Sequence, residues 1–300
     1  MAAPVIDFHI HPIYYDKYCT SAVEWIQMRQ SVPDIQAFID KYSDPAEFAR
    51  FLTENSVDYG VILAELSPVT TGICPNEYVL EFCRGQEKFI PFASINPYMT
   101  ERGSTAAECR RLLTEAGFRG VKLYPTYHYF YPNDRLIYPI YAVAEELGAP
   151  VMVHTGSSVF KGARLKYGDP LFLDDVAVDF PSLKLVMVHS GRGLWYNNAF
   201  FLARLHENVY MEIAGLPPQK LLDYFPELER NADKIIFGSD WPGVVSIKAN
   251  IDIIRALPVK EKTKEKILGG NAARLLGTLV NEHIPTQNDY PFESIPTTFQ

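Results

Sequence analysis

Two histidines occupy alternate positions in the first apolar segment of the chain. The segment VIDFHIHP spans residues 5–12 and places His9 and His11 two residues apart. Residues two apart in a β-strand lie on the same face, so both imidazoles are predicted to point at one spot. By the same alternation Asp7 shares their face, and the apolar residues of the segment lie on the other. Because imidazole nitrogens are common ligands of zinc and similar divalent ions, the pair indicates a metal site.

Three later segments also end in a histidine or an aspartate. They are PVMVHTG with His154, KLVMVHSG with His189 and KIIFGSDWP with Asp240. Each of these residues falls at the C-terminal end of a predicted strand, which is where barrel enzymes place their catalytic groups. Together with the first two histidines they predict a divalent metal site that keeps one position open for water.

The elements that must position these side chains alternate along the chain. Short apolar or β-branched segments are separated by segments with apolar residues at i, i+3 and i+4, as in amphipathic helices. This alternation predicts a parallel sheet, and eight repeats predict an α/β fold, a single (β/α)8 TIM barrel over residues 1–300. A doubly wound open sheet is the alternative, but no GxGxxG follows the first strand. The predicted strands are residues 5–11, 58–64, 89–96, 118–125, 150–156, 184–191, 208–215 and 234–242.

Two segments lie outside the repeat of strands and helices that forms the barrel. Residues 13–44 form a long, Tyr- and Trp-containing insertion after the first strand. Because loops that follow barrel strands lie at the catalytic face, this insertion is predicted to cap the active site. The proline-containing C-terminal tail, residues 278–300, is predicted to wrap the surface.

Composition excludes several classes of protein. The formal net charge of −8 argues against a general nucleic-acid binder, which needs a basic surface. No apolar stretch approaches the roughly 20 residues of a membrane span. The 4 cysteines contain no CxxC pair, which is typical of free thiols in a reducing compartment. With no N-terminal signal pattern, a cytoplasmic protein is expected.

Taken in order, these segments resemble the amidohydrolase superfamily, and within it the amidohydrolase-related group that includes aminocarboxymuconate semialdehyde decarboxylase. The resemblance extends from DFHIHP through GVKLYP, VMVHTG and LVMVHSG to FGSDWP and NAARLLG. It implies one metal ion, most often zinc, with manganese, iron or cobalt as alternatives. It assigns His9, His11, His154 and Asp240 as ligands. It also implies that His189 is an acid/base residue beside the metal-bound water, and that Asp240 can accept a proton from that water.

Further residues are candidates for binding the substrate. Alternation places Lys122 and Tyr124 of GVKLYP on one face, where the lysine could bind an anion. Arg192 follows strand six in HSGRG, and its guanidinium can bind a carboxylate bidentately. In binuclear members of the superfamily a lysine on the fourth strand bridges two metals, so a second metal at Lys122 is an alternative. An aromatic lining for a planar or ring-bearing substrate is predicted from Tyr14, Tyr15, Trp25, Tyr127, His128 and Trp241.

The leading functional hypothesis is hydrolysis of an amide, ester or lactone in a small molecule. Zinc lowers the pKa of bound water to about 7, and His189 would move the proton. The alternative is non-oxidative decarboxylation of an aromatic or unsaturated acid, which the resemblance implies. Against it, Arg192 stands where many decarboxylases of the group carry the Glu of an HxGE motif. A metal-binding protein without turnover is a third hypothesis, and the resemblance allows a homodimer.

Overall fold

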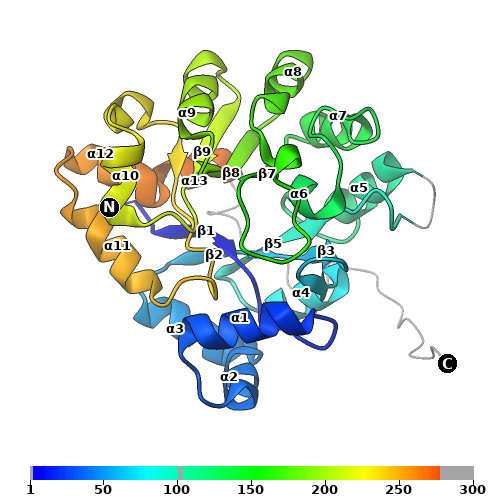
Figure 1. The fold of residues 1–300 in the computed structure, drawn as a ribbon, viewed down its shortest axis with the longest axis vertical. Helices are drawn as coiled ribbons and strands as arrows, with labels where there is room; N and C mark the ends of the chain where they lie inside the picture. Colours follow the sequence, from blue (N-terminus) through cyan, green and yellow to red (C-terminus); the bar gives the residue numbers. More distant parts are fainter. Residues whose placement is uncertain (1–2, 101–103, 278–300) are drawn as a thin grey trace.

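The computed structural model describes residues 3–100 and 104–277, and it contains a barrel of eight parallel strands with helices around it (Figure 1). Each predicted strand segment overlaps one of them, and β8 runs one residue beyond its predicted end. The predicted tail, residues 278–300, lies outside the described residues. In barrel order the strands are β1 (Ile6–Ile10), β2 (Tyr59–Leu63), β5 (Phe89–Ser94), β6 (Val121–Leu123), β7 (Val151–Gly156), β8 (Leu185–Arg192), β9 (Val209–Glu212) and β10 (Ile235–Ile236).

Hydrogen bonds between the two ends of the sheet close the barrel. The backbone N–H of Asp240 donates to the carbonyl of His9 at 2.9 Å, and that of His11 donates to the carbonyl of Trp241 at 2.9 Å. The segment after β10 therefore runs beside β1. This closure brings Asp240 next to His9 and His11.

The helices occupy the outside of the barrel, and α1 and α2 lie in the predicted cap, residues 13–44. Asp34 and Asp44 accept hydrogen bonds from the first backbone N–H groups of α2 and α3, as N-cap residues do. None of the helices in the described ranges is long and apolar enough to cross a bilayer. Their bounds are α1 (Thr20–Gln30), α2 (Ile35–Tyr42), α3 (Pro45–Glu54), α4 (Asn76–Cys83), α5 (Thr105–Thr114), α6 (Pro125–His128), α7 (Tyr138–Glu146), α8 (Phe172–Asp179), α9 (Tyr196–Leu205), α10 (Leu221–Tyr224), α11 (Ile247–Ala256), α12 (Glu261–Glu265) and α13 (Asn271–Leu276).

Two separate apolar layers hold the barrel together. The larger layer lies between the strands and the surrounding helices. The smaller one fills the barrel interior, where Phe8 and Phe92 meet edge to face at 5.5 Å, and α13 contributes to it. Gly269, just before α13, lies against the backbone of Pro4 at the start of β1, so α13 closes the N-terminal end of the barrel. The C-terminal end of the barrel is the end at which the candidate site lies.

The strict alternation predicted for β1 is wrong. Phe8, predicted on the face under the helices, packs in the interior layer, whereas Ile10 packs in the outer layer. The pairing register between β1 and β2 shifts between Asp7 and Ile10. The Asp7 carboxylate accepts backbone hydrogen bonds from His9 at 3.2 Å and from Ser239 at 2.8 Å, and so replaces regular ladder bonds. This irregularity accompanies the inward orientation of His9 and His11, the two predicted metal ligands.

A short antiparallel hairpin, β3 (Glu65–Ser67) and β4 (Gly72–Cys74), follows β2 and was not predicted. It fixes the cap to the barrel, because the N–H of Cys19 donates to Thr71 at 2.9 Å and that of Ile73 donates to Lys17 at 3.0 Å. Gly72 has φ 119°, and a Cβ there would lie 2.3 Å from the Cα of Tyr18. Only glycine allows this close approach.

Candidate metal centre and substrate pocket

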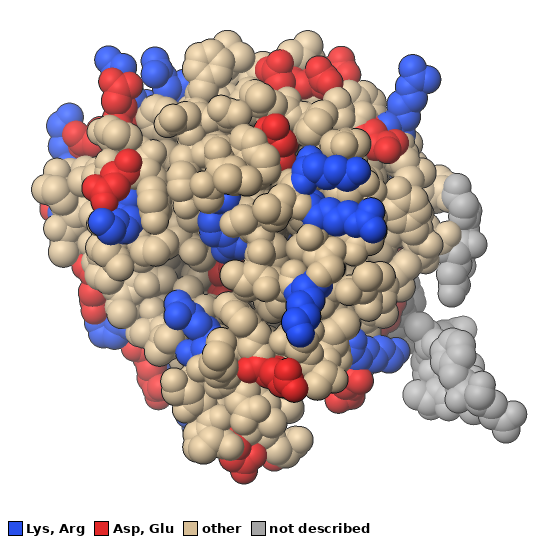
Figure 2. All heavy atoms as spheres, in the orientation of Figure 1, with Lys and Arg blue, Asp and Glu red and all other residues tan. Residues whose placement is uncertain are grey.

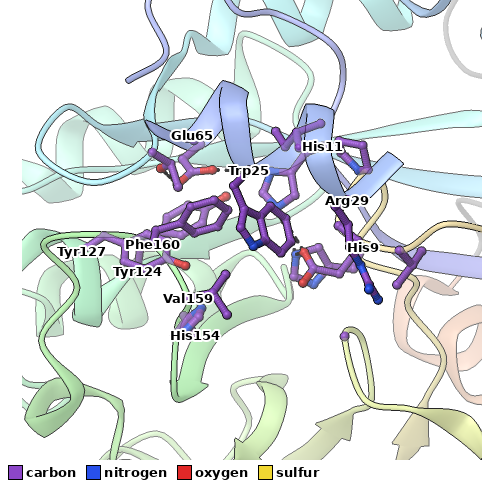
Figure 3. A pocket seen from close by; sticks show the side chains of 18 of the residues that line it. His9, His11, Trp25, Arg29, Glu65, Tyr124, Tyr127, His154, Val159 and Phe160 are labelled. Carbon is purple, nitrogen blue, oxygen red and sulfur yellow. Dashed lines mark hydrogen bonds and ion pairs between the residues drawn. The ribbon is translucent and has the colours of Figure 1, made fainter. Parts of the chain in front are cut away.

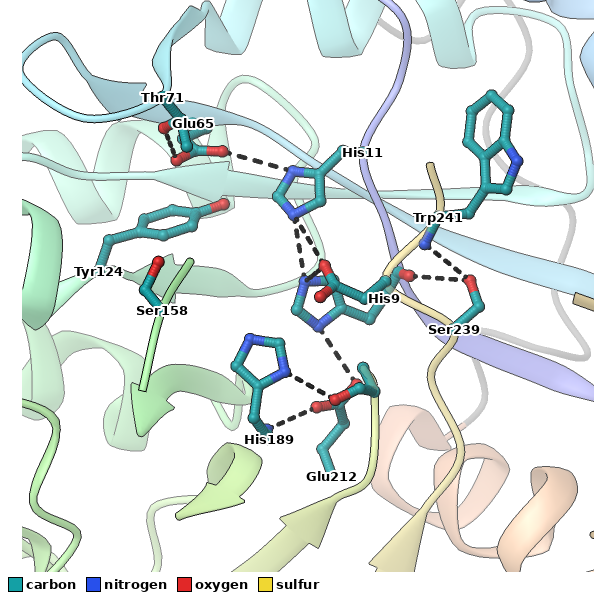
Figure 4. A network of polar contacts seen from close by, with 12 residues as sticks. His9, His11, Glu65, Thr71, Tyr124, Ser158, His189, Glu212, Ser239 and Trp241 are labelled. Carbon is teal, nitrogen blue, oxygen red and sulfur yellow. Dashed lines mark hydrogen bonds and ion pairs between the residues drawn. The ribbon is translucent and has the colours of Figure 1, made fainter. Parts of the chain in front are cut away.

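Three ligand atoms from β1 and from the segment after β10 meet at the C-terminal end of the barrel (Figure 4). The Nε2 atoms of His9 and His11 are 3.2 Å apart. Asp240 Oδ1 lies 3.4 Å from the first of them and 3.7 Å from the second. Ligands bound at 2.0–2.2 Å in tetrahedral geometry are separated by about 3.3–3.6 Å. The spacing therefore fits one small divalent ion.

Each histidine of this group faces a carboxylate with its other ring nitrogen. His9 Nδ1 lies 3.2 Å from Glu212 Oε1, and His11 Nδ1 lies 3.6 Å from Glu65 Oε2. The second oxygen of Glu212 accepts the backbone N–H of His189 at 3.0 Å. Carboxylates in this position fix the tautomer and orientation of metal-binding histidines. The Nε2 lone pairs are thereby directed at the metal position.

The remaining two predicted histidines lie beside this group. The rings of His154 and His189 are 4.7 Å apart, and His154 Nε2 is buried with no hydrogen-bond partner among the described residues. A bound ion would satisfy that nitrogen, although it lies outside the set of ligand atoms within 4.8 Å of one another. His189 Nδ1 lies 2.8 Å from the carbonyl of Ala214, which can only accept a hydrogen bond. Its Nε2 is therefore unprotonated in the neutral ring and free to exchange a proton.

Unusual backbone conformations aim two of these side chains. His189 has φ 63°, Ser190 has φ 48° and Asp240 has φ 66°, a left-handed region that residues other than glycine rarely adopt. Val188, the residue before His189, packs in the interior layer. Simple alternation would then turn His189 outward, and the left-handed turn brings it back into the site. Backbone strain of this kind is typical of functional sites.

Two cations point into the same space. Lys122 Nζ is buried with no hydrogen-bond partner among the described residues, and it lies 5.1 Å from the Tyr124 ring. Burial lowers the pKa of Lys122 to about 8, so the amine is still mostly protonated at neutral pH. Arg192 donates to the carbonyl of Ser157 at 2.8 Å, and its Nη1 lies 3.7 Å from Asp240 Oδ2. A buried cation without a partner is costly, so this end of the pocket favours an anionic ligand.

Burial shifts the other ionisable groups toward their neutral forms. It raises the pKa of Glu212 to about 8 and that of Glu65 to about 7. It lowers the pKa of His9 and of His189 well below the usual value. Neutral imidazoles are the form that binds metals, and a nearby cation favours ionised carboxylates. The donor set is therefore suited to a divalent ion.

These groups form the deep end of a cavity of about 460 Å³ (Figure 3). Of the side chains predicted to bind substrate, Lys122, Tyr124 and Arg192 line it. Of the six aromatic residues predicted at the mouth, Tyr15, Trp25 and Tyr127 line it, whereas Tyr14, His128 and Trp241 do not.

Trp241 is not where the prediction placed it. Its side chain is 1% exposed and packs among the rings of Phe38 at 5.9 Å, Phe48 at 4.9 Å and Phe51 at 5.3 Å. Its backbone N–H donates to the Ser239 hydroxyl at 3.0 Å. Trp241 follows the ligand Asp240 but points the opposite way, into the layer under the helices. Trp241 therefore anchors the segment that carries Asp240 and does not line the cavity.

Glu65 and Glu212 were missed from the sequence. Glu212 stands in the predicted strand NVYMEIAG, where a lone carboxylate at a strand's C-terminal end could have marked it. Glu65 follows β2 in a stretch with no strand signal, and the unpredicted hairpin places it. Its Oε1 accepts a hydrogen bond from the Thr71 hydroxyl, which holds the carboxylate toward the cavity.

Comparison with known proteins gives consistent matches over most of the chain. An amidohydrolase family model matches residues 6–278. Gamma-resorcylate decarboxylase of a Rhizobium species is 25% identical over 252 residues, which cover 67% of this chain and 74% of the relative. The 2-amino-3-carboxymuconate-6-semialdehyde decarboxylase of Dictyostelium discoideum is 23% identical over 234 residues, covering 66% of this chain and 64% of the relative.

Solved structures show the same fold. The uncharacterized TIM-barrel protein Bb4693 of Bordetella bronchiseptica has a TM-score of 0.76 and 25% identity, covering 93% of this chain and 100% of its own. The 5-carboxyvanillate decarboxylase of Novosphingobium aromaticivorans, solved with manganese and a nitrobenzoic acid, has a TM-score of 0.66 and 14% identity, covering 91% and 96%. The predicted TIM barrel is thus confirmed.

Proposed function

Because the chain belongs to the amidohydrolase family, we propose that it is a metal-dependent, non-oxidative decarboxylase of an aromatic or unsaturated carboxylic acid. One structural observation carries the proposal. A three-residue metal-ligand group shares one cavity with two cations, the buried Lys122 and the partly buried Arg192. Both curated relatives described above are decarboxylases, which supports this alternative over the leading hypothesis of hydrolysis. We favour decarboxylation even though this chain carries Arg192 where many decarboxylases of the group carry the Glu of an HxGE motif.

The protein's own residues would hold the metal. His9, His11 and Asp240 are the proposed ligands, with His154 as the fourth. A bound divalent ion would act as a Lewis acid that polarises a substrate oxygen. Zinc and manganese are both compatible with histidine and carboxylate ligands, and the manganese in the 5-carboxyvanillate decarboxylase supports the second.

The two cations would orient the acid. Lys122 at the cavity floor and Arg192 on the wall would bind anionic oxygens of the substrate, which satisfies the otherwise unpartnered ammonium. The ring of Tyr127 lies 5.1 Å from that of His154 and offers a flat contact for a planar substrate. Fixing the acid in this way supplies the orientation that catalysis requires.

Proton transfer to carbon would be the task of His189. Its Nδ1–H is bonded to Ala214, so Nε2 is the atom that carries the transferred proton. Because Nε2 carries no proton in the neutral ring, it would first take one up from solvent to give the imidazolium. That proton would then pass from Nε2 to the carbon that bears the carboxylate. The bond to the carboxylate then breaks, its electron pair returns to the substrate skeleton, and carbon dioxide leaves. The imidazole regains a proton from solvent, and Asp240 is a second candidate carrier in the same cavity.

The test is a paired screen of metal-loaded protein. Hydroxybenzoic and unsaturated dicarboxylic acids are assayed for carbon dioxide release, and aryl esters, amides and lactones of similar size are assayed for hydrolysis. We expect carbon dioxide release from at least one acid, abolished by a chelator. Turnover of esters or lactones alone would overturn the proposal in favour of hydrolysis.

A further inference from the structure

We propose that the mouth of the cavity is a second, apolar subsite that binds an aryl or similarly flat apolar substituent of the substrate acid. The inference rests on the proposed function, because it takes the carboxylate end of the substrate to lie at the deep, charged end. It adds the substrate class, which is an acid that extends beyond a single ring.

One wall of this subsite is a face of α1. Ala22, Trp25, Ile26 and Arg29 all line the cavity, at the i, i+3, i+4 and i+7 spacing of a single helix face. On most surface helices an apolar stripe of this kind packs against the protein core. Here the face lines the cavity: the Trp25 ring is partly exposed there, whereas Ala22 and Ile26 beside it are buried at 1% and 5% exposure.

The loop that follows β7 forms a second wall, which meets the α1 wall at one edge. Its Val159 and Phe160 line the cavity, and the rings of Phe160 and Trp25 meet nearly edge to face with centroids 5.2 Å apart (Figure 3). Val159 is 63% exposed, although it is apolar. Val244, from the loop after β10, contributes a third side. Aromatic and aliphatic groups on three sides favour a flat apolar group over a charged one.

Hydrogen bonds hold the α1 wall in place. The Arg29 guanidinium donates to the carbonyl of Gly243 at 3.0 Å, and the Gln30 amide donates to those of Pro242 at 2.5 Å and Val244 at 2.6 Å. The last turn of α1 is thereby fixed to the loop that follows the metal ligand Asp240. A wall that is formed before the ligand arrives costs less free energy on binding.

The size of the cavity points to an extended ligand. A closed apolar cavity of about 150 Å³ holds one benzene ring, whereas this cavity measures about 460 Å³. Figure 2 shows both Lys or Arg and Asp or Glu side chains on this face of the molecule. A single-ring acid at the deep end would leave the part of the cavity that Trp25, Val159 and Phe160 line unfilled.

Calorimetric binding of matched acids to the metal-loaded protein tests the subsite without requiring turnover. The probes are benzoate, biphenyl-3-carboxylate and biphenyl-4-carboxylate. We expect at least one biphenyl acid to have a Kd at least tenfold below that of benzoate. Trp25→Ala and Phe160→Ala should remove most of this gain and leave benzoate binding within about twofold. Val159→Asp, at an exposed position that tolerates a charge, should do the same.

Phe201→Ala is the matched control, because Phe201 is 59% exposed on α9 and does not line the cavity. It should bind all three acids as the wild type does. Equal affinity for benzoate and both biphenyl acids would overturn the subsite and leave the proposed function standing. Weaker binding of all acids in Trp25→Ala would likewise overturn it, since the helix would then only shape the deep end. If no acid binds at all, both proposals fail.

Discussion

His189 is the residue at which metal binding and chemistry are expected to separate. It lies next to the ligand group, with ring centroids 5.2 Å from His9, but its backbone and Nδ1 are tied to Glu212 and Ala214. Those bonds orient the ring independently of any ion. His189 also forms, with His9 and Glu212, a second group whose ligand atoms lie within 4.8 Å of one another. We propose that it moves a proton and does not hold the metal.

His189→Asn should retain the metal and lose turnover. The asparagine amide can still donate to Ala214 but cannot carry a proton, so the rate of carbon dioxide release should fall by on the order of 10²–10⁴. Metal per chain is measured by elemental analysis beside the rate. His206→Asn is the control, because His206 pairs with Asp174 outside the cavity. Loss of metal from His189→Asn would instead make His189 a ligand.

Glu212→Gln and Glu65→Gln should weaken metal binding about 10- to 100-fold. Glu212 accepts from both His9 and His189, and a glutamine has one acceptor oxygen for these two donors. We therefore expect the larger loss at Glu212, measured as the metal Kd by competition with a chelating dye. Glu54→Gln, exposed on α3, should leave the Kd unchanged. Unchanged affinity in both buried variants would refute the orienting role.

The sequence predicted which residues form this site better than it predicted where their side chains point. His9, His11 and Asp240 meet as expected, because strand order and strand ends follow from the repeat of strands and helices. Trp241 was misplaced because its direction depends on packing against α2 and α3, which no local pattern records. Glu65 was missed because long-range hydrogen bonds of the cap, and not its neighbours in sequence, bring it to the cavity.

At the scale of elements, the eight strands were predictable but their irregularities were not. Apolar runs between helical segments predict a parallel barrel. The register shift in β1 and the left-handed turn at His189 depend on the Asp7 and Glu212 carboxylates, which accept backbone hydrogen bonds from the distant residues Ser239 and His189. These irregularities direct the side chains of the candidate site inward.

The end of β7 gives a test of this close packing. Gly156 has φ 87°, and a Cβ there would lie 2.3 Å from the backbone nitrogen of Arg192. Gly148 has φ 65° but nothing within 4 Å of such a Cβ. Gly148→Ala should cost about 1–2 kcal/mol in the free energy of unfolding, from backbone conformation alone. Gly156→Ala should cost more and also weaken acid binding, because Arg192 must move.

Urea unfolding and benzoate calorimetry on the two variants check this expectation. Equal losses of stability would show that the contact with Arg192 is relaxed at little cost. Normal acid binding by a destabilised Gly156→Ala would show that Arg192 does not bind the substrate.

In the whole molecule the two ends of the barrel differ: apolar side chains close one end, and the candidate site lies at the other. Apolar side chains and α13 close the N-terminal end, while buried ionisable groups collect at the C-terminal end. A cluster of desolvated charged groups destabilises a fold unless it is paired. The metal is therefore expected to contribute to stability as well as to catalysis. The single domain, the homodimer and the cytoplasmic location remain predictions.

Metal removal should lower the melting temperature reversibly. Free metal at 100 times its Kd stabilises the folded state by about 2.7 kcal/mol, which corresponds to on the order of 5 °C in Tm for a domain of this size. Scanning calorimetry of chelated protein, with and without added zinc or manganese, measures the shift. His9→Ala should show no shift with metal. A chelated protein that melts at the same temperature as the metal-loaded one would contradict the expectation.

The metal content of the purified protein is the most direct test of the proposed single metal centre. Protein purified without a metal-affinity step is analysed for bound elements beside His9→Ala and Asp240→Ala. We expect about one zinc or manganese per wild-type chain and a large loss in both variants. About two ions would instead make Lys122 a candidate bridge, and the proposed single centre would be wrong. No metal after reconstitution, or full metal in either variant, would contradict the ligand set and the decarboxylase that depends on it.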